Sequence, residues 1–222
     1  MKKFFKYFSI IILVAGLGFI LGFFVLKNIN KKLPVILTPT IISIATPSDS
    51  NFSLENAPSE SLRGQITKMI GNIDWQGRTA TESARIVSPI SIQQGENLIT
   101  EENATLSLNF PNICTVNFSP KTEIDVIQTL PAGLVFTQIT GVGEYIKTGD
   151  DSVSVRSLNL LTEVDGDSLI SINPKKPIIT LSIKSGSIVA AYNDLKYNSH
   201  EVTVTAGHTY TFNSSTRRGV AK

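Results

Sequence analysis

Hydrophobic and polar residues alternate along most of the chain after about residue 64, in runs short enough to be β-strands. The clearest run is 104–110, where an alanine, two leucines and a phenylalanine fall at every second position. Similar runs occur at 65–71, 113–118, 123–127, 134–140, 152–161, 168–172, 178–183, 187–192, 201–204 and 209–212. No long helical period is present, and about 155 residues suffice for a two-layer core. The pattern predicts an all-β domain over 64–218, an antiparallel sandwich or a jelly-roll-like fold.

Turn residues between these runs set the expected connections. The runs between 104 and 127 are separated only by Pro111-Asn112 and Ser119-Pro120-Lys121, so we expect three antiparallel neighbours. The glycine-containing segments 141–143, 165–167 and 184–186 are expected to be loops between strands. Segment 165–167 has the Asp-x-Asp spacing of a calcium loop but no later bidentate glutamate, and we interpret it as a solvated turn.

A different pattern occupies the N-terminus, where Phe8 to Leu26 is uncharged and apolar except for one serine. At about 1.5 Å of rise per residue, a helix of this length spans roughly the 30 Å hydrocarbon core of a bilayer. A cleaved signal peptide has a shorter apolar core and a small-x-small cleavage site, which is missing around 23–27. We therefore predict that residues 1–32 hold a short cytoplasmic tail and an uncleaved transmembrane anchor, with the lipid bilayer as its partner.

The lysines on the two sides of this run do not decide its orientation. Three lysines and the terminal amine precede it and three lysines follow it, so the positive-inside bias is nearly balanced. The later composition, with one cysteine and many strand formers, favours a cytoplasmic N-terminus and a periplasmic or extracellular C-terminal domain. Residues 33–63 carry four prolines among Ser, Thr and Asn, which predicts an extended linker.

The net charge changes sign when the anchor is set aside. The chain has 20 Lys and Arg against 18 Asp and Glu, but six of the lysines and none of the acids lie in the first 32 residues. The remainder therefore has 14 basic and 18 acidic side chains. Phosphate binding needs clustered positive charge. We expect no nucleic-acid partner.

The residue types that carry enzyme chemistry are few and scattered. His200 and His208 are the only histidines, and they lack the carboxylate–histidine spacing of a zinc site. Cys114 lies inside the alternating run 113–118, where a small strand residue explains it better than a catalytic thiol. Segment 141–143 lacks the strand-to-helix context of a nucleotide-binding fingerprint. We expect no enzyme activity, no catalytic residue, no metal ligand and no cofactor.

Aromatic side chains form the candidate binding surface. Trp75 stands beside a Gln-Gly turn, and Tyr192, Tyr197 and Tyr210 lie near the C-terminal strands. These rings could stack on a sugar or clamp a peptide, or they could fill the core and the strand edges. A solvent-exposed Trp75 would favour a glycan.

Three consecutive segments resemble the FecR domain. Segment 91–100 has an apolar residue, two spacers, Gly-Glu and an apolar pair ending in threonine. The alternating run 104–110 follows, and then Val116-x-Phe118-x-Pro120-x-Thr122-x-Ile124. The earlier Trp75 and the later segments 183–189 and 202–208 are similar to the second half of that family. The chain departs from the family at Pro111-Asn112, where an Asp-Gly turn is usual, and at 155–158, which lacks the glycine of a Val-Arg-Gly-Thr-like segment.

The resemblance implies an extracytoplasmic β module that binds or scaffolds, without a family active site. FecR proteins that regulate iron uptake carry several dozen anti-sigma residues before the membrane helix, whereas seven residues precede Phe8 here. We therefore expect a membrane-anchored module that holds a protein partner in a bacterial envelope, with a glycan as a variant ligand. The alternative is a FecR-like relay component that acts through a membrane partner.

Overall fold

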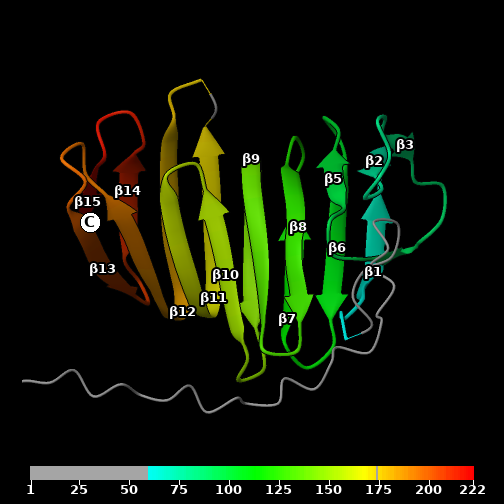
Figure 1. Cartoon of the computed structure of the whole chain (residues 1–222), viewed down its shortest axis with the longest axis horizontal. Coiled ribbons are helices and arrows are strands. Elements are labelled where there is room, and N and C mark those ends of the chain that lie inside the picture. Colours follow the sequence, from blue (N-terminus) through cyan, green and yellow to red (C-terminus); the bar gives the residue numbers. More distant parts are fainter. Residues whose placement is uncertain (1–59, 174) are drawn as a thin grey trace, which may run out of the picture. The chain divides into compact units, whose positions relative to one another are not determined.

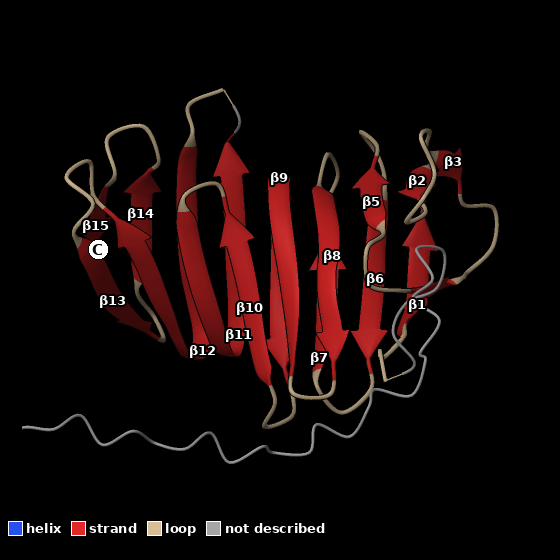
Figure 2. Cartoon of the chain, viewed as in Figure 1, coloured by secondary structure: helices blue, strands red, loops and turns tan. Residues whose placement is uncertain are grey.

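The alternating pattern forms fifteen β-strands and no helix within residues 60–173 and 175–222, the part of the chain that the computed structural model describes (Figure 2). The strands are β1 Gly64–Ile70, β2 Ile73–Gln76, β3 Ala84–Arg85, β4 Ser91–Ile92, β5 Asn97–Thr100, β6 Thr105–Phe110, β7 Cys114–Phe118, β8 Glu123–Leu130, β9 Gly133–Lys147, β10 Ser152–Ser157, β11 Leu160–Asn173, β12 Ile178–Asn193, β13 Ser199–Thr205, β14 Thr209–Asn213 and β15 Arg218–Ala221. The predicted all-β fold is confirmed.

The N-terminal predictions are not tested by this structure. The anchor from Phe8 to Leu26 and nearly all of the 33–63 linker lie outside the described residues. Within the described part, no helix has the length and apolar character needed to cross a bilayer. The described residues all belong to one structural unit, Phe52–Lys222.

One continuous sheet forms two layers. Layer A contains, in order, β3, β2, β5, β8, the first half of β9, β10, the first half of β11, the second half of β12, and β13. Layer B contains β4, β1, β6, β7, the second half of β9, the second half of β11, the first half of β12, β14 and β15. Figure 1 shows the strands side by side from β1 to β15. Because β9, β11 and β12 belong to both layers, this is a single folded sheet and not two separate ones.

The chain passes between the layers at both ends of the strands. The crossings at one end include Gly71-Asn72, 101–104, 119–122 and Gly141. Those at the opposite end include Gly166, Gly186 and 206–208. Neighbouring crossings are hydrogen-bonded: Thr100 N–H donates to the Thr122 carbonyl at 2.9 Å, and Ala206 N–H donates to the Gly186 carbonyl at 3.0 Å.

Four local predictions were wrong, three of them at crossings between the layers. Segments 141–143, 165–167 and 184–186 lie inside β9, β11 and β12, because bonds to adjacent crossings keep the backbone in the sheet. The run 152–161 is in fact two strands, separated by the turn Leu158-Asn159.

Two pairings also differ from the expected antiparallel order. β8 pairs with β5 and β9 but not with β7, because the chain crosses to the other layer at 119–122. The first half of β9 pairs with β10 in parallel, with Leu134 opposite Val153.

The core fills the space between the layers with alternating side chains from both. Phe136 of layer A lies against Phe110 and Tyr145 of layer B, with ring centroids 5.7 and 6.0 Å away. The hydroxyl of Tyr145 donates to Gln138 Oε1 at 3.0 Å, and Gln138 Nε2 donates to the carbonyls of Gly141 and Ile170. A buried amide is therefore satisfied by groups that also fix the crossover of β9.

Candidate functional site

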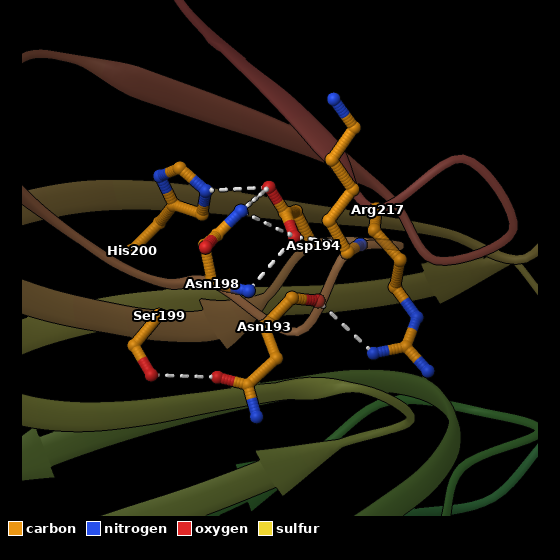
Figure 3. Close-up of polar contacts among 7 residues, drawn as sticks. Asn193, Asp194, Asn198, Ser199, His200 and Arg217 are labelled. Carbon is orange, nitrogen blue, oxygen red and sulfur yellow. Dashed lines mark hydrogen bonds and ion pairs between the residues drawn. The ribbon is translucent and has the colours of Figure 1, made fainter.

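The candidate surface lies at the end of the strands that also carries the Gly141 crossing, opposite the Gly166 and Gly186 crossings. It is made of the β10–β11 turn (158–159), residues 192–200 around the β12–β13 loop, and the β14–β15 loop (214–217), here called the C-terminal loop cluster. Asn159 Nδ2 donates to Ser214 Oγ at 2.7 Å, which joins a turn of layer A to a loop of layer B. Arg217 Nη1 donates to the Asn193 carbonyl at 3.1 Å (Figure 3). Side-chain bonds therefore hold these three loops in fixed positions.

Asp194 organises the β12–β13 loop. Its Oδ1 accepts the backbone N–H groups of Lys196 and Asn198 at 2.8 and 2.9 Å, and its Oδ2 lies 3.1 Å from His200 Nε2 (Figure 3). The hydrogen bond from His200, followed by those from Asn198, holds the pKa of this carboxyl well below its usual range. The carboxylate is therefore charged at neutral pH and occupied by groups of its own loop.

An aromatic stack lines two hollows in this cluster. The Tyr192 ring is stacked on His200, with centroids 5.2 Å apart, and packs on Phe212 of layer B at 4.8 Å. One is an open hollow of about 410 Å³, and the second has about 450 Å³. Tyr192, His200 and Arg217 line both. The first, here called the arginine hollow, is also lined by Arg156, Leu158, Asn159, Leu160, Leu161, Ala191, Asn193 and Ser199.

Three residues in or next to this cluster have backbone conformations that their side chains disfavour. Leu158, Tyr197 and Arg217 have φ angles of 53, 65 and 51°. The left-handed region costs a non-glycine residue roughly 1–2 kcal/mol, and glycine or asparagine normally occupies it. Such strain is often retained at functional sites. The three strained residues come from three different loops, so the strain is concentrated at one surface.

Large apolar side chains are also exposed here. Leu158, Leu161, Leu195 and Tyr197 are 38, 50, 68 and 88% exposed. Leu158 and Leu161 line the arginine hollow, and Leu195 lines the second hollow. Exposed apolar side chains gathered on one surface mark an interaction site more often than scattered ones do.

The four aromatic residues predicted as a binding surface do not lie together. Tyr192 and Tyr197 both belong to the C-terminal loop cluster, Tyr192 half-buried and Tyr197 exposed. Tyr210 is in the core at 2% exposure, where burial raises the pKa of its hydroxyl above the usual value. Trp75 lies in β2, half-buried against the core, and not in the solvent-exposed position that would favour a glycan.

The groups with catalytic potential are placed as follows. Cys114 is buried in β7, and burial raises the pKa of its thiol to about 12. His200 is paired with Asp194, but the hydroxyl of the adjacent Ser199 donates to Asn193 Oδ1 at 2.9 Å and not to the imidazole. In the described part of the chain, no three His, Cys, Asp or Glu side chains gather in a way that could hold a metal ion. This arrangement offers recognition groups but no activated nucleophile.

Comparison with known proteins gives a limited likeness in fold. No family profile matches the chain, and no curated protein matches it. Two crystal structures of a candidate anti-sigma factor from Parabacteroides distasonis ATCC 8503, at 2.50 and 1.65 Å resolution, are similar to it. Each has a TM-score of 0.48 and 9% sequence identity, over 57% of this chain. The matched region spans 58% of that protein's chain, so the likeness covers little more than half of either protein.

Sequence reasoning found the tyrosines of this surface but missed its other members. Leu158 and Arg156 were hidden in a run that was interpreted as one strand, and Arg217 stands beside Arg218 as an ordinary surface pair. A usable signal was present, because Leu158 and Leu195 are large apolar residues at turn positions where polar residues or glycine are usual.

Proposed function

We propose that this chain is a membrane-tethered, extracytoplasmic β module of a bacterial envelope that binds a protein partner through the C-terminal loop cluster. The observation that supports this best is the combination of tied loops and exposed apolar side chains at one surface. The bonds Asn159–Ser214 and Arg217–Asn193 fix loops from both layers before any partner arrives. Fixed loops lose little conformational entropy on binding, which favours affinity.

The proposed tether is the apolar run from Phe8 to Leu26, and the proposed spacer is 33–63. Both remain sequence-based parts of the proposal. In this arrangement the linker gives the β module reach from the bilayer, and the loop cluster supplies the contacts.

A FecR-like relay is the second candidate function. It is supported by the all-β course of segment 91–124, which forms β4, a turn at Gly95 with φ of 85°, β5, β6, β7 and β8. In a relay, partner binding at the β module would be transmitted through the anchor to a membrane protein with its own cytoplasmic domain.

Site-specific photo-crosslinking in the native membrane tests the proposed function. A photoreactive amino acid at Leu161 or Leu195 is expected to yield one dominant protein adduct. The control position is Val87, which is 89% exposed in the β3–β4 connection, far along the sheet order. Equal adducts at all three positions, or none at Leu161 and Leu195, would contradict the proposal. A partner with a cytoplasmic domain would favour the relay over simple scaffolding.

A further inference from the structure

The arginine hollow has a chemical character that differs from the rest of the domain. Two arginines, Arg156 and Arg217, line this hollow together with one histidine, His200. No Asp or Glu side chain is among its lining residues. Beyond residue 32 the chain carries more acidic than basic side chains, so two unneutralised arginines in one hollow run against the overall charge. This local excess attracts an anionic group.

Neither arginine is neutralised by the described residues. No ion pair of Arg156 or Arg217 is present among them, although Arg217 donates one hydrogen bond to the Asn193 carbonyl. Glu163 lies diagonally across the β10–β11 pair from Arg156, and Glu201 lies opposite Ala191 on β13, yet neither is paired with an arginine. Asp194, behind the aromatic stack, is already occupied by His200 and Asn198. Guanidinium donors therefore remain for a ligand.

Apolar surface adjoins these donors. Leu161 is opposite Arg156 in the β10–β11 register, and Leu158 stands in the turn that follows Arg156. Both leucines are exposed, and Ala191 of β12 lies next to Leu161 in the sheet. The carboxylate of a ligand can accept two parallel hydrogen bonds from one guanidinium. An aliphatic side chain next to that carboxylate in the ligand would bury the exposed surface of Leu158 and Leu161. A sugar carboxylate would leave this apolar surface uncovered.

We propose that the arginine hollow binds an acidic segment of a protein partner, with an Asp or Glu carboxylate between Arg156 and Arg217 and a neighbouring leucine or isoleucine against Leu158 and Leu161. This inference rests on the proposed function and specifies its chemistry. It predicts a partner segment in which acidic and aliphatic residues are adjacent. The fixed position of the Arg217 loop places one of the two charges before the ligand arrives.

The test is an NMR titration of the purified full-length chain in detergent micelles with three nine-residue peptides. The first has eight glutamates around a central leucine, the second has lysine in place of each glutamate, and the third has serine in place of the leucine. We expect amide shifts at 156–161 and 191–193 with the first peptide, at least fivefold weaker binding of the third, and no binding of the lysine peptide. Raising the salt from 50 to 500 mM should weaken the first peptide several-fold.

Substitutions separate charge from folding. R156Q is expected to raise the Kd of the first peptide at least about fivefold, R156Q with R217Q at least tenfold, and R156K with R217K much less. Because the Arg156 side chain has no hydrogen bond or ion pair with the residues that the structure describes, the R156Q variant is informative even if R217Q disturbs its loop. K68Q, at an exposed β1 lysine without an ion pair among the described residues, removes the same charge elsewhere and should leave the Kd unchanged.

Three results would overturn the inference: no shifts at millimolar first peptide, equal binding by R156Q, or tighter binding of polygalacturonate than of the peptide. The last result would identify an acidic glycan as the ligand class. If a crosslinked protein partner is found at Leu161 together with any of these results, the proposed protein-binding function is supported. Only the proposal that the arginine hollow binds an acidic segment is then rejected.

Discussion

At the scale of single residues, the loop cluster keeps large side chains where the backbone favours glycine. Leu158, Tyr197 and Arg217 each have a left-handed backbone, and each has its side chain at the surface where burial gives little in return. Replacing such a residue by glycine would relieve strain of roughly 1 kcal/mol. Their presence is therefore explained better by a contact made outside the molecule than by folding alone.

Cys114 gives the clearest pH-dependent prediction. Burial raises the pKa of its thiol from 9.0 to about 12, so between these values the folded state holds a proton that the unfolded state has lost. The stabilisation is fully present below pH 9 and is lost as the pH rises through 12, with a slope of up to about 1.4 kcal/mol per pH unit. Urea unfolding at pH 8.5–11 should show a shallower decline for Cys114→Ala than for the parent protein.

The two proteins are compared by how steeply the free energy of unfolding falls with pH, and not by its absolute value. Removing the buried sulfur leaves a small cavity that lowers stability equally at every pH. Burial and then the charge of Cys114 raise the pKa of Tyr145, so the difference in slope reports the thiol together with its effect on Tyr145. The other tyrosines contribute equally in both proteins. Identical slopes would mean that the thiol is not shielded from solvent as the structure indicates.

At the scale of elements, the crossings between the two layers depend on glycine to different degrees. Gly141 has a φ of 84°, and a Cβ there would lie 2.5 Å from the Lys121 carbonyl oxygen, against the backbone of the neighbouring crossing. Gly207 has a similar φ of 81°, but a Cβ there would meet nothing within 4 Å. The two positions share the conformational cost and differ in the steric one.

Alanine at these two glycines should therefore separate the two costs. Gly207→Ala is expected to lower the free energy of unfolding by about 1 kcal/mol, from the left-handed backbone alone. Gly141→Ala adds a clash within the sheet and should cost about 3 kcal/mol or more. Urea titrations of both variants measure the difference. Equal losses would show that the neighbouring crossing at 119–122 gives way without resistance.

The same glycines explain where sequence reasoning succeeds and fails. Alternation located strands such as 104–110 and 178–183 because each buries one face of a local run. It placed loops at Gly141, Gly166 and Gly186 because a left-handed glycine interrupts alternation in a turn and in a bent strand alike. What keeps these bends within the sheet is bonding to residues far along the chain, such as Thr122 Oγ1 to the Val142 carbonyl, and no local pattern records it.

The candidate site was predictable to a smaller extent for a related reason. Tyr192 and Tyr197 stand out by residue type, so they were found. Arg156, Leu161 and Arg217 become neighbours only because β10, β11, β12 and the β14–β15 loop end at the same side of the fold. Their proximity depends on the strand order, which short-range alternation does not determine.

At the scale of the whole described unit, the shared strands couple the two layers. β9, β11 and β12 each contribute to both, so neither layer can be removed without unpairing the other. Core contacts such as Phe136 with Tyr145 cross between the layers. We therefore expect the sheet from β1 to β15 to unfold as one cooperative unit, although it exceeds the size at which two-state behaviour is usual.

Trp75 makes this expectation measurable, because it is the single tryptophan and lies in β2, far along the sheet from β14. Its fluorescence transition in urea should coincide with the far-UV circular dichroism transition. Phe212→Leu, in the core of β14, should shift both midpoints by the same amount, for a loss on the order of 1 kcal/mol. Tyr197→Ala changes an exposed side chain in the neighbouring loop, and the stability derived from each midpoint should change by less than about 0.5 kcal/mol.

If Phe212→Leu moved the dichroism midpoint but not the Trp75 midpoint, the C-terminal strands would form a separate unit. The loop cluster could then loosen on partner binding without disturbing β2, and scaffolding would be favoured over a relay that must pass through the whole sheet.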